Sequence, residues 1–299
     1  MSGYDGRVVL AVLSLLVAAA GVVDEAAYRR EVEAWRRARE ARLVAEGGWL
    51  SLAGLSWLKP GANRFGADPE SGGVLPDGAP THAGSFVLES GRVTVEVAPG
   101  VAVTLRGHPV TKAVLRSDAG GATPDVLTLG ALTIQVIERH GRLAIRLKDQ
   151  NSQARRTFTG IDHYPVRPEY RVVARFIPNP GPTTIRVPDV LGLTEDMPSP
   201  GHVEFELGGQ KLRLDPVIES PGDTQLFFVF RDRTSGKTTY GAGRFLYAEA
   251  PADGHVILDF NKAYNPPCSF TPFATCPLPP PQNHLAVPVE AGERHVPHR

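Results

Sequence analysis

Short segments in which every second residue is apolar constrain the fold of this 299-residue chain most strongly. In residues 92–97 three valines alternate with polar residues, and residues 132–136 and 143–147 repeat the alternation. A period of two places the apolar side chains on one face of a β-strand. The 31 glycines and 27 prolines supply turns between such segments. The pattern predicts a mainly β fold.

The strand pattern is interrupted once by a long polar stretch. Residues 149–168 contain DQNSQARRTFTG followed by two prolines, which is typical of a boundary between domains. Short strands with Gly-rich turns predict a β-sandwich over residues 49–150. A second β-rich unit is predicted over residues 151–299. Within that unit, LFFVF at 226–230 lacks alternation, which indicates a strand buried on both faces.

The N-terminus carries an apolar run before the first predicted element. Residues 8–23 read VVLAVLSLLVAAAGVV, which matches a signal-peptide core and is shorter than the roughly 20 residues of a membrane span. We therefore expect residues 1–23 to be a signal peptide and the protein to be secreted or periplasmic, with no stable membrane span after cleavage. An uncleaved anchor and a misassigned start codon are the alternatives.

Residues 24–48 are predicted to form a helix and its C-terminal stop. Asp24 is a suitable N-cap, and Gly47-Gly48 ends the helical pattern. Four apolar or aromatic residues fall near one face of this helix, where they would pack on the β-rich body. They are Tyr28, Val32, Trp35 and Leu43.

Composition and motifs exclude several classes of function. Lys+Arg and Asp+Glu both number 32, so the chain has no general basic surface for nucleic acid. The sequence lacks the nucleophile elbow, the phosphate-binding loop, the zinc-protease helix and the dinucleotide fingerprint. Its nine histidines are scattered, and none stands at metal-ligand spacing. We therefore predict neither a cofactor nor a metal site.

The N-terminal part resembles a forkhead-associated (FHA) sandwich. The segment GANRFGADPESGGVLPDGAPTHAGSFVLESGRVTV, with GALTIQV as a later strand, follows the rhythm of strands and turns of that fold. FHA domains bind phosphothreonine through an Arg, a Ser and an Asn. Here Ala67 stands at the Arg position, residues 79–81 lack the Ser, and Arg106 precedes Gly107 where Asn is usual. The resemblance therefore implies the fold and not phosphopeptide binding.

A wider resemblance covers residues 28–293. The segments GWLSLAGLSWLKPG, DRTSGKTTYGAGRFLY and DFNKAYNPPCSFTPFATCPLPPPQNHL are similar to the bacterial family called domain of unknown function 1684 (DUF1684). The last of them is long and idiosyncratic, which makes the resemblance specific. The family is named for its lack of an assigned function, so the resemblance implies none.

The segment 259–285 is the strongest candidate for a site. It is polar, stiffened by prolines and placed at the end of an apolar strand. We predict a pocket in which Asp259 is a general base or the charge partner of Arg244, and Tyr264 orients the ligand. The residues expected to bind the ligand are Asn261, Asn265 and Asn283. The alternative is that these side chains only satisfy the main chain of the loop and that Arg244 and Asp259 form a buried brace.

The chain has two cysteines, Cys268 and Cys276, both in this segment. In an exported protein such a pair is first interpreted as a disulfide. The alternatives are a metal site with His284, a nucleophilic cysteine assisted by His284 and Asn283, and two free thiols. The spacing favours neither zinc binding nor a catalytic pair.

The sequence leaves two main hypotheses of function. One is an extracytoplasmic enzyme, such as a hydrolase, that acts on a small polar or anionic substrate. The other is a non-catalytic envelope protein that binds a small ligand or a partner through the same surface. A third hypothesis is that the segment has a purely structural role. Nothing in the sequence indicates the substrate or the oligomeric state.

Overall fold

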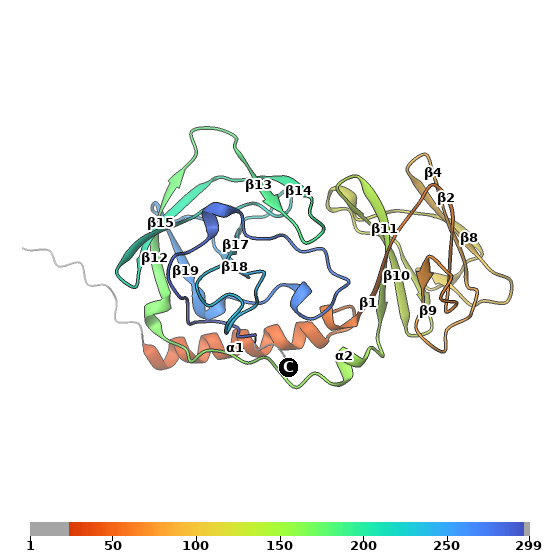
Figure 1. Ribbon diagram of the computed structural model, residues 1–299, viewed down its shortest axis with the longest axis horizontal. Coiled ribbons are helices and arrows are strands. Elements are labelled where there is room, and N and C mark those ends of the chain that lie inside the picture. The colour runs from red at the N-terminus through yellow and green to blue at the C-terminus, as the bar shows by residue number, and fades with distance from the viewer. Residues whose placement is uncertain (1–23, 296–299) are drawn as a thin grey trace, which may run out of the picture.

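The computed structural model describes residues 24–295 and is mainly β, as predicted. Figure 1 shows two β-rich bodies beside each other, with the helix α1 (Glu25–Val44) lying along the C-terminal one. The predicted signal peptide falls on residues outside the described part of the chain. Within residues 24–295, no helix has the length and apolarity to cross a membrane.

The helix α1 begins and ends where the capping residues predict. The Asp24 side chain accepts hydrogen bonds from the main-chain N–H groups of Ala26 and Ala27, at 3.0 and 3.1 Å. These bonds satisfy donors that have no partner within the helix. After the helix the chain turns back so closely that a Cβ on Gly48 would lie only 2.4 Å from two carbonyl oxygens of the last turn. Position 48 therefore requires glycine.

The N-terminal body consists of a six-stranded and a five-stranded sheet. In spatial order the first contains β1 (Leu52–Trp57), β11 (Arg142–Asp149), β10 (Leu132–Arg139), β9 (Val126–Leu129), β6 (Thr104–Leu105) and β7 (His108–Pro109). The second contains β3 (Gly73–Val74), β2 (Gly61–Gly66), β4 (Gly84–Glu89), β5 (Arg92–Val97) and β8 (Lys112–Leu115). Apolar side chains of both sheets, such as Phe65, Phe86 and Ile134, share one core.

The C-terminal body follows a short helix, α2 (Gln153–Arg156), and contains three sheets. The four-stranded sheet has the order β16 (Gln210–Leu214), β15 (Gly201–Leu207), β12 (Arg171–Pro178) and β19 (His255–Asp259). The two hairpins pair β13 (Thr184–Pro188) with β14 (Thr194–Pro198), and β17 (Leu226–Phe230) with β18 (Arg244–Ala248). All five residues of β17 are buried, which confirms the interpretation of LFFVF.

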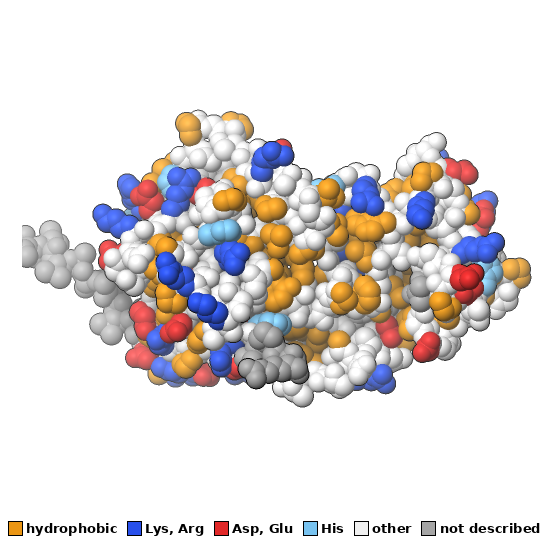
Figure 2. All heavy atoms as spheres, viewed as in Figure 1, with side chains coloured by type: hydrophobic (Ala, Val, Ile, Leu, Met, Phe, Trp, Pro, Cys, Tyr) orange, Lys and Arg blue, Asp and Glu red, His pale blue; other side chains and the backbone are white. Residues whose placement is uncertain are grey.

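The two bodies pack against each other. Leu52 of β1 belongs to a buried cluster that otherwise contains residues of the C-terminal body, among them Val187 and Phe227. At the same junction, His140 Nε2 lies 2.8 Å from Asp189 Oδ2. Figure 2 shows hydrophobic side chains gathered between the bodies on the face in view. This junction holds the start of the sandwich, and with it the end of α1, in a set position on the C-terminal body.

Candidate functional site

A cavity of about 740 Å³ lies between α1 and the strands β18 and β19. This volume is within the range of small-molecule sites. The lining comes from the buried face of α1, the turn that follows it, β12 and the segment 247–264. The charged and aromatic residues of the lining, with His255, are Glu31, Trp35, Arg39, Arg42, Trp49, Arg171, Tyr247, Glu249, His255, Asp259, Lys262 and Tyr264.

Arg39 is the central charged residue of the cavity. It lies on the same stripe of α1 as Tyr28, Val32 and Leu43, and its side chain is only 5% exposed. Nε donates to Glu293 Oε1 at 3.1 Å, and one terminal nitrogen, Nη2, donates to the carbonyl of Asn265 at 3.0 Å. No described residue accepts a hydrogen bond from the other terminal nitrogen, Nη1. The cavity is therefore lined by a buried guanidinium with one donor group still available.

Glu293, which does not line the cavity, neutralises the charge of Arg39. Its side chain is fully buried and accepts a hydrogen bond from the main-chain N–H of Asn265 at 2.7 Å. Burial raises the pKa of Glu293 and lowers the pKa of Arg39, and the ion pair between them opposes both shifts. Neither partner has a second oppositely charged side chain within 4 Å in the described part of the chain. The two charges therefore depend on each other.

Aromatic rings surround the guanidinium group of Arg39. Its central carbon lies 4.6 Å from the centroid of the Trp49 ring and 4.8 Å from that of Tyr264. Trp35 and Tyr247 extend this wall, with ring centroids 6.3 and 6.2 Å from that of Tyr264. Burial raises the pKa of both tyrosines, so their phenol groups stay neutral at physiological pH. The wall offers flat apolar faces next to a cation.

The other end of the cavity is polar. Asp259 Oδ1 accepts a hydrogen bond from the Tyr28 hydroxyl at 2.6 Å and one from the Asn261 N–H at 3.2 Å. Asp259 Oδ2 has no hydrogen-bond partner among the described residues, and Lys262 Nζ lies 3.4 Å away. Lys262 also pairs with Glu31 at 2.6 Å, and this bond lowers the pKa of Glu31. The carboxylate of Asp259 thus has one hydrogen-bonded oxygen and one oxygen that is buried beside the ammonium group of Lys262.

Two arginines of the lining have no carboxylate partner. In the described part of the chain, neither Arg42 nor Arg171 forms an ion pair within 4 Å. Arg171 lies with its guanidinium carbon 5.9 Å from the centroid of the Tyr28 ring. Arg42 stands in the last turn of α1 and is exposed. These two cations give the cavity positive charge that no protein carboxylate compensates directly.

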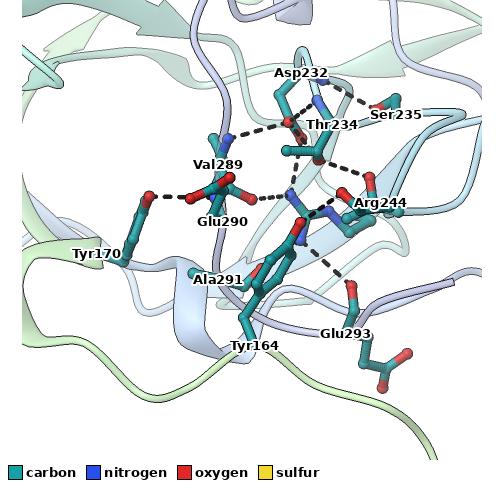
Figure 3. A network of polar contacts seen from close by, with 12 residues as sticks. Tyr164, Tyr170, Asp232, Thr234, Ser235, Arg244, Val289, Glu290, Ala291 and Glu293 are labelled. Carbon is teal, nitrogen blue, oxygen red and sulfur yellow. Dashed lines mark hydrogen bonds and ion pairs between the residues drawn. The ribbon is translucent and has the colours of Figure 1, made fainter.

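Of the predicted site residues, only Asp259 and Tyr264 line this cavity. The predicted pairing of Asp259 with Arg244 is wrong. Arg244 is fully buried and pairs with Asp232, with Nη2 2.8 Å from Oδ2. It also donates to the carbonyls of Val289 and Ala291, so the C-terminal segment, and not the end of β19, lies against it (Figure 3). Arg244 is therefore a brace between a hairpin and the C-terminal segment.

The three predicted asparagines bind main-chain groups. Asn261 accepts from the N–H of Arg167 at 3.0 Å and donates to its carbonyl at 2.8 Å. Asn283 does the same with the main chain of Asp215, at 2.8 and 2.9 Å. Asn265 donates to a carbonyl near the C-terminus. None of the three lines the cavity. Apart from the hydrogen bond that Asn261 Nδ2 donates to the Tyr28 hydroxyl at 2.9 Å, these contacts satisfy the main chain of loops.

Cys268 and Cys276 are joined as a disulfide, with their Cα atoms 6.3 Å apart. The bridge contradicts the alternatives of free thiols, a metal site and a nucleophilic cysteine. Within residues 24–295, no cluster of His, Cys, Asp and Glu is arranged to hold a metal ion. The loop that the bridge closes contains Phe270, whose ring centroid lies 5.8 Å from the guanidinium carbon of Arg39. The disulfide therefore closes the loop that places Phe270 beside Arg39.

The cavity residue that the sequence analysis missed is Arg39. A signal existed, because Arg39 follows Trp35 and precedes Leu43 at helical spacing on the face assigned to packing. An arginine within an apolar stripe requires a partner or a ligand. Trp49 was named only as part of the GWLSLAGLSWLKPG segment, without a role in the site. His255 and Lys262 carried no signal in the sequence alone.

Comparisons with known proteins bear on the C-terminal body. A family model described as protein of unknown function (DUF1684) matches residues 156–294. The C-terminal half of the chain belongs to the DUF1684 family. The sequence resemblance extended further, since it began at residue 28, and the GWLSLAGLSWLKPG segment lies outside the match. The DUF1684 part supplies Arg171, the segment 247–264 and Glu293 to the site, whereas α1 and Trp49 lie outside it.

A solved structure is similar to about half of the chain. It is an NMR structure of an uncharacterized protein of Haloarcula marismortui, with 31% sequence identity and a TM-score of 0.41. The match covers 48% of this chain and 81% of the archaeal protein. No curated protein matches the chain. The FHA resemblance of the N-terminal body stays a prediction.

Proposed function

We propose that this protein binds a small molecule with an anionic group and a flat apolar part in the cavity beside α1. The observation that carries the proposal is Arg39, a buried guanidinium set among aromatic rings, with one nitrogen that has no acceptor among the described residues. A charge is costly to bury, and Glu293 satisfies only part of its hydrogen-bonding capacity. An anionic group of a ligand would satisfy the rest.

The surroundings of Arg39 support the same ligand class. Arg42 and Arg171 add positive charge that no described carboxylate pairs with, which favours an anion. Trp35, Trp49 and Tyr247 offer faces on which a flat apolar group can pack. The volume of about 740 Å³ is large enough for both parts of such a ligand.

The first test is a calorimetric titration with 2-naphthoate and with 2-naphthalenemethanol, which have the same ring system and differ in charge. We expect the carboxylate to bind at least about tenfold more tightly, because only it pairs with Arg39. Arg42→Gln is expected to weaken naphthoate binding by about threefold, since this cation is exposed. Arg186→Gln, on the exposed surface of β13, is the matched control and should leave it unchanged. Equal affinity for both compounds contradicts the proposal.

A second candidate function is catalysis, and the unsatisfied oxygen of Asp259 favours it. Asp259 lines the cavity, and its buried Oδ2 has no hydrogen-bond partner among the described residues, so it could accept a proton from a water molecule or a substrate hydroxyl that reaches it. In this scheme Lys262, 3.4 Å away, would hold the charge of the carboxylate in place. The described lining contains no Ser, Thr or Cys, so the attacking group would be water.

Asp259→Asn tests this candidate. Asparagine can still accept the bonds from Tyr28 and Asn261, so we expect the fold and the affinity for naphthoate to persist. If the protein is a hydrolase, turnover should fall by about 10²-fold or more. The measurement is hydrolysis of nitrophenyl esters, phosphates and glycosides, with Asp196→Asn on β14 as the control. Unchanged turnover in Asp259→Asn excludes the carboxylate as the base.

We further propose that the protein works outside the cytoplasm. The apolar run at residues 8–23 and the disulfide Cys268–Cys276 support this location, since disulfides persist in oxidising compartments. We expect protein recovered from its native host to have a mass that fits cleavage near Ala20, and its thiols to alkylate only after reduction. An intact N-terminus with both thiols reactive before reduction contradicts the location.

The sandwich of residues 49–150 is proposed to be FHA-like without phosphopeptide binding. Two packed sheets with a shared core support the likeness. Ala67 and Arg106 stand where the phosphate-binding residues of such domains are expected, which argues against that activity. The sandwich then serves to hold the turn at 47–49 beside the cavity.

A further inference from the structure

The charged side chains that line the cavity are of both signs. The cations are Arg39, Arg42, Arg171 and Lys262, and the carboxylates are Glu31, Glu249 and Asp259. A ligand that is only an anion, such as a phosphate, would be repelled by the carboxylates. A ligand that also carries hydroxyl groups can donate to the carboxylates and accept from the cations. The lining thus suits a ligand rich in hydroxyls that bears a limited negative charge.

The aromatic wall is not available to a cationic ligand. Arg39 already occupies the region over Trp49 and Tyr264, at 4.6 and 4.8 Å from their ring centroids. A quaternary ammonium group would meet a like charge there. Tyr247 is 37% exposed, and its ring plane is within 18° of that of Tyr264. Phe227 also stacks on the Tyr247 ring, with the ring centroids 4.9 Å apart, and the exposed part of Tyr247 is suited to the C–H groups of a neutral ring.

The cavity extends along α1. Glu31 and Arg42 both line it and are eleven positions apart, which corresponds to about 16 Å of helix. The aromatic wall and Arg39 lie between these two residues in the sequence of the helix, and Asp259 and Lys262 lie at the Glu31 end. A single sugar-sized ring would contact only part of this length. The ligand should therefore contain at least two linked rings.

We infer that the ligand is an acidic saccharide of at least two rings, with a carboxylate on one or more of them. A carboxylate of the sugar binds Arg39 and Arg42, one ring packs on Tyr247, and hydroxyls donate to the carboxylates of the lining. This assignment rests on the proposed function, because it names the ligand class for the same cavity. It needs no catalytic step.

The test compares digalacturonate with its dimethyl ester, which has the same rings and no charge. Full-length protein carrying Trp57→Phe is used, because the remaining tryptophans, Trp35 and Trp49, both line the cavity and report on its occupation. We expect digalacturonate to change the tryptophan fluorescence and to bind at least about tenfold more tightly than the ester. Saturation-transfer NMR should show transfer to the ring C–H protons. Equal binding of acid and ester overturns the inference.

Variants locate the binding. Tyr247→Ala is expected to weaken digalacturonate binding by about fivefold, through loss of the ring contact. Arg42→Gln should weaken the acid and leave the ester unaffected. Arg186→Gln, which lies outside the cavity, is the matched control. Loss of affinity in the control equal to that in Arg42→Gln overturns the assignment to this site.

Two further ligands separate this inference from the proposed function. If 2-naphthoate binds and digalacturonate does not, the cavity binds flat anions and the saccharide is wrong. If neither binds, the proposed function fails together with it. If adenosine monophosphate binds more tightly than digalacturonate, the ligand is a nucleotide and the inference from the carboxylates of the lining is overturned.

Discussion

Replacement of Arg244 by methionine is expected to lower the free energy of unfolding by about 3–5 kcal/mol. The substitution leaves the carboxylate of Asp232 buried without its partner, 2.8 Å from where the guanidinium was. It also removes the donor to the carbonyls of Val289 and Ala291, which holds the C-terminal segment on the C-terminal body (Figure 3). The measurement is urea unfolding followed by circular dichroism. The urea midpoints of variant and wild type are compared, provided that their unfolding curves have the same dependence on urea concentration.

Two variants control this experiment. Arg186→Met removes a guanidinium whose side chain is 78% exposed and should change the free energy of unfolding by no more than about 0.5 kcal/mol. Arg244→Met combined with Asp232→Asn removes both charges and should be less destabilised than Arg244→Met alone, because no uncompensated carboxylate remains. A change below about 1 kcal/mol in Arg244→Met would show that the brace carries little stability.

Local signals in the sequence were sufficient for the strands. Alternation predicted β5, β10 and β11, and the lack of alternation at 226–230 predicted that β17 is buried on both faces. Both inferences depend on residues within a few positions of each other, where the period of the strand alone decides. For the same reason, the N-cap at Asp24 was predictable, since the N–H groups that donate to its side chain lie two and three positions away.

The partner of Arg244 required knowledge of the hairpin. Asp232 follows β17 directly, and Arg244 opens β18 opposite Phe230, so the antiparallel register brings the two side chains together. The prediction instead chose Asp259, because the GRFLY strand that contains Arg244 was expected to lie beside the end of the strand that contains Asp259. A hairpin with a long 231–243 connection was the available clue. The choice among several buried carboxylates was not determined by any local pattern.

The candidate site was predictable only in part. Asp259 and Tyr264 were named from the unusual segment 259–285, and both line the cavity. Arg39 was missed because its meaning depends on Glu293, which is 254 positions away in the sequence. The rings that surround it come from two segments that are far apart in the sequence, with Trp49 in one and Tyr264 and Phe270 in the other. Such a site forms only when α1 docks on the C-terminal body, which no local periodicity specifies.

The pairing of Arg39 with Glu293 leads to the second large effect. Replacement of Arg39 by methionine is expected to cost about 3–5 kcal/mol at neutral pH and to abolish ligand binding, because Glu293 is left as an uncompensated buried carboxylate. Burial already raises the pKa of Glu293, and loss of the guanidinium raises it further. An acid whose pKa is higher in the folded than in the unfolded state favours folding when protonated. That contribution is complete below the unfolded pKa and is lost as the pH rises through the folded pKa.

The destabilisation of Arg39→Met should therefore be smaller at pH 4 than at pH 8, with the wild type measured at both. Urea midpoints at the two pH values provide the measurement. Adding Glu293→Gln to Arg39→Met removes the titrating group, so the double variant should lose this extra pH dependence and recover stability at pH 8. Glu293→Gln alone leaves Arg39 without its carboxylate and serves as the matched control. If Arg39→Met is destabilised equally at both pH values, Glu293 does not carry the charge that holds Arg39 in the cavity, and another anion must be sought for it.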